Sequence, residues 1–129
     1  RTGEPSPTTV LLMAAARRDF FLTVQHGQFY QGKPVIGYDL PGFGDELCGL
    51  PYLPRLIAKA RAKLVGSMGD DIIYCCENDR RFFRDHGNIH PADFLRVVWA
   101  AGDSDPKVYD YVRQRTLSVS SAVPDNEQM

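Results

Sequence analysis

Four side chains of types that carry enzyme chemistry lie within residues 76–86. Cys76 supplies a thiol, and both a nearby cation such as Arg80 and the start of a helix favour its reactive thiolate form. Asp79 and His86 supply groups that can donate or accept protons. Together these residues predict a site of an enzyme or of a protein that binds a small ligand.

The same segment also fits a purely structural role. Cys75 and Cys76 follow an apolar run at residues 72–74, which is typical of inert cysteines in a core. Asp79 lies where a carboxylate can cap a helix and form ion pairs with Arg80 or Arg81. The spacing of the cysteines, histidines and carboxylates does not by itself imply a nucleophile with its base. The reactive site and the structural role therefore both stay open.

The cysteines and histidines do not have the spacing of a metal site. Zinc sites usually contain two pairs of ligands, each pair separated by about two to four residues. The candidates here are an adjacent cysteine pair, a separate cysteine and two histidines: Cys75, Cys76, Cys48, His86 and His90. Gly87 and Pro91 are expected to break the helix between the two histidines. We therefore expect no metal and no other cofactor.

A second group of candidate residues is cationic. Arg55, Lys59 and Lys63 recur at every fourth position of a helix predicted at about residues 54–65. Residues with this spacing lie on one face of a helix. Such a row is either a solvated face or a contact for an acidic protein partner, a phosphate or an anionic lipid headgroup. We predict these three residues as the partner or anion contact.

Size and composition restrict the class of protein. A chain of 129 residues has the size of one domain and can bury a core without metals or disulfides. Its 15 basic and 16 acidic residues nearly cancel, so we expect no specific nucleic-acid partner. The odd number of cysteines, 3, indicates free thiols in a reducing compartment. The longest apolar run, residues 10–16, is far shorter than the roughly 20 residues that span a bilayer, so we expect no membrane-spanning segment.

Capping and helix-breaking residues divide the chain into about five helices. Thr8 or Thr9 is expected to cap a first helix that runs from Val10 into the mid-twenties. Glycines and prolines in residues 27–49 then predict an extended loop that wraps the domain. Further helices are predicted at about residues 54–65, 80–86, 91–101 and 106–116, and Asn78 or Asp79 is expected to cap the helix at 80–86. The predicted fold class is all-α, in a compact single domain with polar tails.

This pattern predicts three regions. Residues 1–46 form an N-terminal extension with one helix and the Gly/Pro-rich loop, residues 47–116 form a helical domain, and residues 117–129 form a polar tail. Because the chain begins at Arg1 without an initiator methionine, we interpret it as a processed or trimmed form, for which removal of an organellar targeting peptide is one cause. The polar ends contain too few apolar residues to order themselves, so we expect other subunits to hold them.

Several blocks of residues from this helical domain carry a family resemblance. The blocks are residues 53–62 (LPRLIAKARA) with Leu64 and Gly66, Ile73-Tyr74 with Cys76, residues 79–83 (DRRFF) with His86-Gly87, Phe94-Leu95, and Gly102, Ser104 and Asp105 before Val108. In this order they resemble an uncharacterised family of small, mainly bacterial helical domains, a domain of unknown function, over about residues 47–113. The resemblance implies a helical domain and favours Cys76 over Cys75 as the candidate reactive thiol. It implies no reaction and no catalytic residue. Residues 1–45 depart from the family pattern, so we interpret the added helix and loop as specific to this protein.

These observations support two hypotheses of function. The first is a non-catalytic accessory or scaffold subunit of a larger multi-protein assembly, with a mitochondrial respiratory complex, ATP synthase or ribosome as its setting. Peripheral contact with anionic lipid is compatible with it. The alternative is a soluble bacterial enzyme or small-ligand binder, with its site near Cys76, Asp79, Arg80 and His86.

Overall fold

Five α-helices account for most of the structure. The computed structural model describes residues 4–122, and the helices in this range are α1 (Pro7–Thr23), α2 (Leu53–Val65), α3 (Glu77–Asp85), α4 (Pro91–Ala101) and α5 (Asp105–Ala122). The predicted all-α class with about five helices is therefore confirmed. The only sheet within the described residues is a short two-stranded ribbon.

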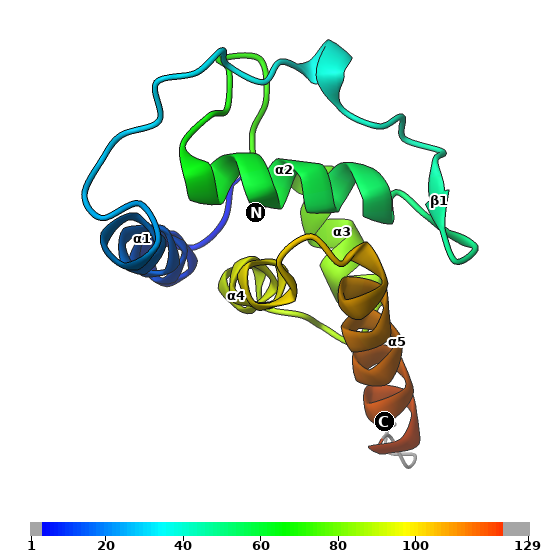
Figure 1. Cartoon of the computed structure of the whole chain (residues 1–129). Coiled ribbons are helices and arrows are strands. Elements are labelled where there is room, and N and C mark those ends of the chain that lie inside the picture. Colours follow the sequence, from blue (N-terminus) through cyan, green and yellow to red (C-terminus); the bar gives the residue numbers. More distant parts are fainter. Residues whose placement is uncertain (1–3, 123–129) are drawn as a thin grey trace.

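Helix α4 lies at the centre of the arrangement. It packs between α1 and α5, while α2 crosses over one side of it (Figure 1). The largest apolar side chains with almost no exposed surface come from α2, α4 and α5 and from the turn before α3: Leu53, Leu56, Ile57, Leu64, Cys75, Phe94, Leu95, Val98, Val108 and Val112. Burial of this apolar surface is the main term that stabilises the fold.

Helix α1 begins earlier than the sequence indicated. Ser6, rather than Thr8 or Thr9, is the N-cap, because its Oγ accepts the N–H of Thr9 at 3.1 Å. Pro7 takes the first helical position, where its missing N–H and fixed φ cost nothing. The helix packs against α2 and α4 through its buried residues Met13 and Ala16.

The long connection after α1 passes over the outer side of α2 (Figure 1). It contains the 3-10 helix η1 (Gly37–Asp39) and the strands β1 (Glu46–Leu47) and β2 (Leu50–Pro51), which pair antiparallel. The two residues that join the strands, Cys48 and Gly49, both have positive φ, which is the backbone that a tight hairpin needs. The predicted extended loop is thus present, and a small ribbon occurs where no strand was expected.

Helices α2 and α4 begin and end where the sequence predicted. Each begins around a proline, Pro54 or Pro91, and each is followed directly by a glycine with positive φ, Gly66 or Gly102. Helix α3 differs from its prediction, because it starts at Glu77 and its N-cap is Cys76 instead of Asn78 or Asp79. The break between His86 and His90 is present, since α3 ends at Asp85 and α4 begins at Pro91.

Helix α5 extends beyond its expected end near Thr116. It continues to Ala122, so the first part of the predicted polar tail, residues 117–122, is helical. No glycine or proline lies between Thr116 and Pro124, and serine carries only a small penalty in helix propensity. The rest of the predicted tail, residues 123–129, lies outside the described residues, as do residues 1–3 of the N-terminal extension.

Candidate functional site

The carboxylate of Asp79 is the centre of a buried polar network. Asp79 is fully buried and lies in the first turn of α3. Its Oδ2 accepts the backbone N–H of Cys75 at 2.8 Å and that of Cys76 at 3.4 Å. These amides precede the helix, so the carboxylate reaches back to the chain that enters α3 and fixes its direction.

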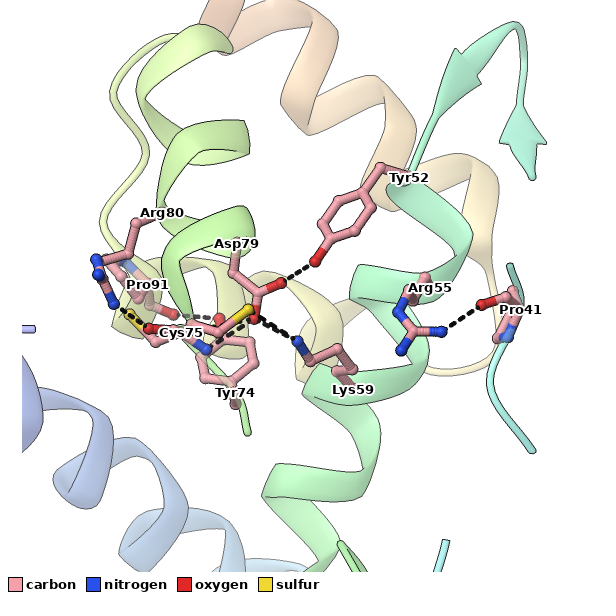
Figure 2. A network of polar contacts seen from close by, with 10 residues as sticks. Pro41, Tyr52, Arg55, Lys59, Tyr74, Cys75, Asp79, Arg80 and Pro91 are labelled. Atoms are coloured by element: carbon pink, nitrogen blue, oxygen red, sulfur yellow. Dashed lines mark hydrogen bonds and ion pairs between the residues drawn. The ribbon is translucent and has the colours of Figure 1, made fainter. Parts of the chain in front are cut away.

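Lys59 supplies the charge that balances Asp79. Its Nζ lies 2.8 Å from Oδ2 of Asp79, and the exposed fraction of the lysine side chain is only 4%. The same ammonium donates to the Sγ of Cys76 at 3.5 Å. A buried ion pair carries a large desolvation penalty, which is offset here by the additional hydrogen bonds to the carboxylate. Figure 2 shows Lys59 reaching from α2 to Asp79 on α3.

Tyr52 completes the network from the residue just before α2. Its phenol donates a hydrogen bond to Oδ1 of Asp79. Tyr52 adopts a left-handed backbone with a φ of 76°, which is uncommon outside glycine and allows the chain to pass directly from β2 into α2. Burial, and then the hydrogen bond and charge of Asp79, raise the pKa of the Tyr52 phenol well above its ordinary value. The phenol is therefore a hydrogen-bond donor at neutral pH.

The two adjacent cysteines have different environments. Cys75 is buried with a φ of 73°, and burial raises the pKa of its thiol to about 11. Cys76 is half-buried and contacts Lys59, while Cys48 is exposed at the tip of the hairpin. Cys75 therefore behaves as a core thiol although Arg80 lies beside it, because burial outweighs that charge, whereas the partly exposed Cys76 lies beside the Lys59 ammonium.

This difference predicts the order in which the thiols react. With iodoacetamide at pH 8, Cys48 is expected to react fastest, Cys76 more slowly and Cys75 roughly a hundredfold more slowly than Cys48, because little of its thiol is ionised. Peptide mass spectrometry of samples quenched over time measures the three rates. Equal rates for Cys75 and Cys48 would contradict the burial of Cys75.

The four residues predicted as one site do not come together. Cys76 and Asp79 are neighbours, but His86 is at the other end of α3, about 15 Å away along the helix axis. The His86 ring stacks on Phe82 with ring centroids 4.1 Å apart, and its Nδ1 lies 2.8 Å from the Phe82 carbonyl oxygen. The structure therefore does not bring Cys76 and His86 together, because the nine residues of α3 separate them.

Arg80 also points away from the network. Its Nη1 donates to the carbonyl oxygen of Cys75 at 2.7 Å, and Figure 2 shows it on the far side of Cys75 from Lys59. It lines another cavity, between α3 and the start of α1. Its contribution to the site is therefore to hold the turn at Cys75.

The predicted cationic stripe is divided in the structure. Successive residues at a spacing of four drift by about 40° around a helix, so Arg55 and Lys63 face different neighbours. Lys59 turns inward to Asp79 and is not part of an exposed row. Lys63 lies beside α1, where burial, and then the charge of Arg17, lower the pKa of its ammonium. Only Arg55 and Lys59 remain close to one site.

A cavity of about 220 Å³ adjoins the network. Its walls include three network residues, Tyr52, Lys59 and Cys76, together with Arg55 and Phe43. Arg55 donates from Nη1 to the carbonyl oxygen of Pro41 at 3.0 Å, and its guanidinium carbon lies 4.2 Å from the centroid of the Phe43 ring. The long loop before β1 thus forms one wall of the cavity, and α2 forms another.

Two absences within residues 4–122 bear on the class of site. No three His, Cys, Asp or Glu side chains in this range are grouped as metal ligands. None of its helices has the length and apolar character that crossing a membrane requires. Among the described residues, the buried charged side chains are Lys59 and Asp79, and both belong to the polar network.

Comparison with known families gives a match to a domain of unknown function, DUF5069, over residues 44–123. The chain belongs to the DUF5069 family. The expected family resemblance is confirmed, and the matched segment extends beyond the predicted limits of about residues 47–113 at both ends. Neither the curated proteins that were searched nor the solved structures gave a match.

The DUF5069 segment contains the whole polar network. Tyr52, Lys59, Cys76 and Asp79 all lie within residues 44–123, whereas α1 and the loop over α2 precede it. The sequence did not indicate Tyr52 as a member of the network, because nothing in it predicts a left-handed backbone for a tyrosine just before a helix. The inward position of Lys59 had one signal, since Leu56, Ile57 and Ala60 surround it in the sequence.

Proposed function

We propose that the protein is a non-catalytic accessory subunit that binds another protein through the exposed side of α1. One observation carries this proposal. Residues 10–13 are four consecutive apolar residues, yet only Met13 is buried, while Val10, Leu11 and Leu12 are exposed. A run of exposed apolar residues on a folded domain is unfavourable unless it serves an interface.

Exposed apolar residues are concentrated in the N-terminal extension. Those that precede the DUF5069 segment are Val10, Leu11, Leu12, Leu22, Val24, Phe29, Tyr30, Ile36, Tyr38 and Phe43. Within the described part of the DUF5069 segment, Ile73 and Leu117 are the large apolar residues with comparable exposure. The added segment thus covers part of the core through Met13 and Ala16, and it also carries most of the exposed apolar surface, which we assign to a partner.

The extension is held firmly on the domain. Arg17 donates from Nε to the carbonyl oxygen of Lys63 at 3.1 Å, and Gln25 donates to the carbonyl oxygen of Val65 at 2.9 Å. An ion pair of 2.8 Å joins Asp19 on α1 to Arg96 on α4. The exposed residues of α1 are therefore presented in a fixed arrangement, which lowers the entropic cost of binding.

The α1 outer face, defined as Leu11, Ala15, Arg18 and Leu22, indicates the chemistry of the partner. These positions follow a spacing of four, three and four residues, so they lie on one side of the helix. Arg18 is exposed and forms no ion pair within residues 4–122. A matching partner would present an apolar groove with a carboxylate opposite Arg18. The predicted mitochondrial setting stays a prediction.

Replacing Leu11 with glutamate is expected to remove the partner. Leu11 is 71% exposed, so the substitution should leave the fold intact while placing a charge in the centre of an apolar contact. Purification through a C-terminal tag under native conditions should recover a stoichiometric partner with the wild-type chain and lose it with Leu11→Glu.

Leu117→Glu is the matched control for this experiment. Leu117 is also exposed and apolar but lies on α5, so this variant should keep the partner. Equal recovery with Leu11→Glu would contradict the proposal. A second outcome would also contradict the proposal: the chain is recovered without a protein partner and floats with vesicles that contain phosphatidylserine. In that case the exposed side of α1 would bind an anionic membrane surface instead of a protein.

A further inference from the structure

Two cations on one wall of the cavity beside the network have hydrogen-bonding capacity that the protein does not use. Arg55 and Lys59 are four residues apart on α2, which places neighbouring side chains about 5–6 Å apart. The Nε of Arg55 is buried and has no acceptor in the described residues. Lys59 gives two of its three ammonium protons to Asp79 and Cys76. Lys59 can therefore donate one further hydrogen bond, and Arg55 uses only one of its five N–H groups, in its bond to Pro41.

The rest of the cavity limits what such an acceptor can be. Phe43 and Ile72 supply apolar surface, and the volume of about 220 Å³ is smaller than the roughly 300–1,000 Å³ of sites for drug-sized ligands. Asp71 is the acidic residue of the wall, and its Oδ2 accepts the N–H of Gly37 at 2.9 Å. A compact ligand with anionic oxygens and a short apolar part fits these walls.

We propose that this cavity binds a small organic anion, whose carboxylate or phosphate oxygens accept hydrogen bonds from Arg55 and Lys59. The Arg55 guanidinium lines the cavity and uses only one N–H, in its bond to Pro41, so an anionic oxygen there can accept a charge-assisted bond from another of its N–H groups. Asp79 holds Lys59 in place for this contact, and the Tyr52 phenol in turn holds Asp79. The site lies on the DUF5069 domain and is separate from the α1 outer face.

Titration of the isotopically labelled full chain with inorganic phosphate and, separately, with acetate tests this proposal. Backbone amide chemical shifts are followed at constant ionic strength. The amides of Cys76 and Asn78, on the wall of the cavity, should shift and saturate with at least one of the two anions. A phosphate response assigns a phosphate-bearing ligand, and a response to acetate alone assigns a carboxylate.

Three variants make the test specific. Arg55→Gln is expected to weaken binding about tenfold, because a charge-assisted donor is lost. Asp71→Asn should strengthen binding, since it removes the negative charge from the wall and keeps an acceptor for Gly37. Lys107→Gln makes the same change of charge as Arg55→Gln on α5, away from the cavity, and should leave the affinity unchanged.

Other outcomes would overturn the proposal. One is that neither anion causes saturable changes in the amide chemical shifts. The other is that Arg55→Gln and Lys107→Gln weaken anion binding equally, which would indicate a general charge effect. Because Arg55 is in the first turn of α2 and is only partly buried, its variant is expected to fold, and unchanged amide shifts on α4 would demonstrate this. Failure here leaves the α1 interface intact, since that interface is tested by Leu11→Glu.

Discussion

The Asp79→Ala variant is expected to lose about 3–5 kcal/mol of unfolding free energy, because it breaks a buried ion pair and leaves Lys59 as an uncompensated charge. It also removes the acceptor of the Tyr52 phenol and of the Cys75 N–H, both of which lie in or next to the core. The entry of the chain into α3 depends on these bonds, so the turn at residues 72–76 should become less ordered as well.

Urea unfolding followed by circular dichroism measures this loss. The double variant Lys59→Met with Asp79→Leu should recover a large part of the stability, since it removes both charges and fills their space with apolar groups. Glu77→Ala, which removes an exposed carboxylate of the same helix turn, should change the free energy by less than about 0.5 kcal/mol. A loss below 1 kcal/mol for Asp79→Ala would contradict the account of the network.

The Gly87→Ala variant is expected to cost about 3 kcal/mol, because the new methyl group meets backbone that cannot move easily. A Cβ at Gly87 would lie 2.7 Å from the carbonyl oxygen of Arg115 and 2.6 Å from Cγ of its side chain. In addition, Gly87 has a φ of 95°, which a residue with a side chain adopts only at a cost. Arg115 donates from Nε to the Gly87 carbonyl oxygen at 2.8 Å, so the clash would also separate α5 from the turn after α3.

Gly44→Ala is the matched control for the glycine experiment. Nothing lies within 4 Å of a Cβ at Gly44, and no positive φ is involved, so this variant should be neutral or slightly stabilising. Thermal and urea unfolding of both variants give the comparison. A Gly87→Ala protein as stable as the Gly44→Ala protein would contradict the close approach of α5 to this turn.

Helix boundaries set by local chemistry could be predicted from the sequence. Pro54 and Gly66 delimit α2, and Pro91 and Gly102 delimit α4, because a missing N–H and a positive φ act within a few residues. The end of α5 was misjudged for the converse reason. Loss of apolar periodicity near Thr116 does not stop a helix when no glycine or proline follows.

The candidate site is formed by contacts between residues that are distant in the sequence. Lys59 and Asp79 are on different helices, and their pairing follows from how α2 crosses the start of α3, which no spacing in the chain reveals. Their residue types suggested an exposed cation and a helix cap. The capping role of Asp79 toward Cys76 was close to the prediction, whereas the inclusion of His86 assumed a proximity to Cys76 that the nine residues of α3 exclude.

The native mass of the particle that contains this protein tests the accessory-subunit proposal most directly. The chain would be purified gently from its own cells through a C-terminal tag and measured by native mass spectrometry. The expected result is a particle far heavier than the 14.5 kDa chain, with one other protein at fixed stoichiometry that is lost in Leu11→Glu. The free chain, alone or as a homodimer, would contradict the proposal.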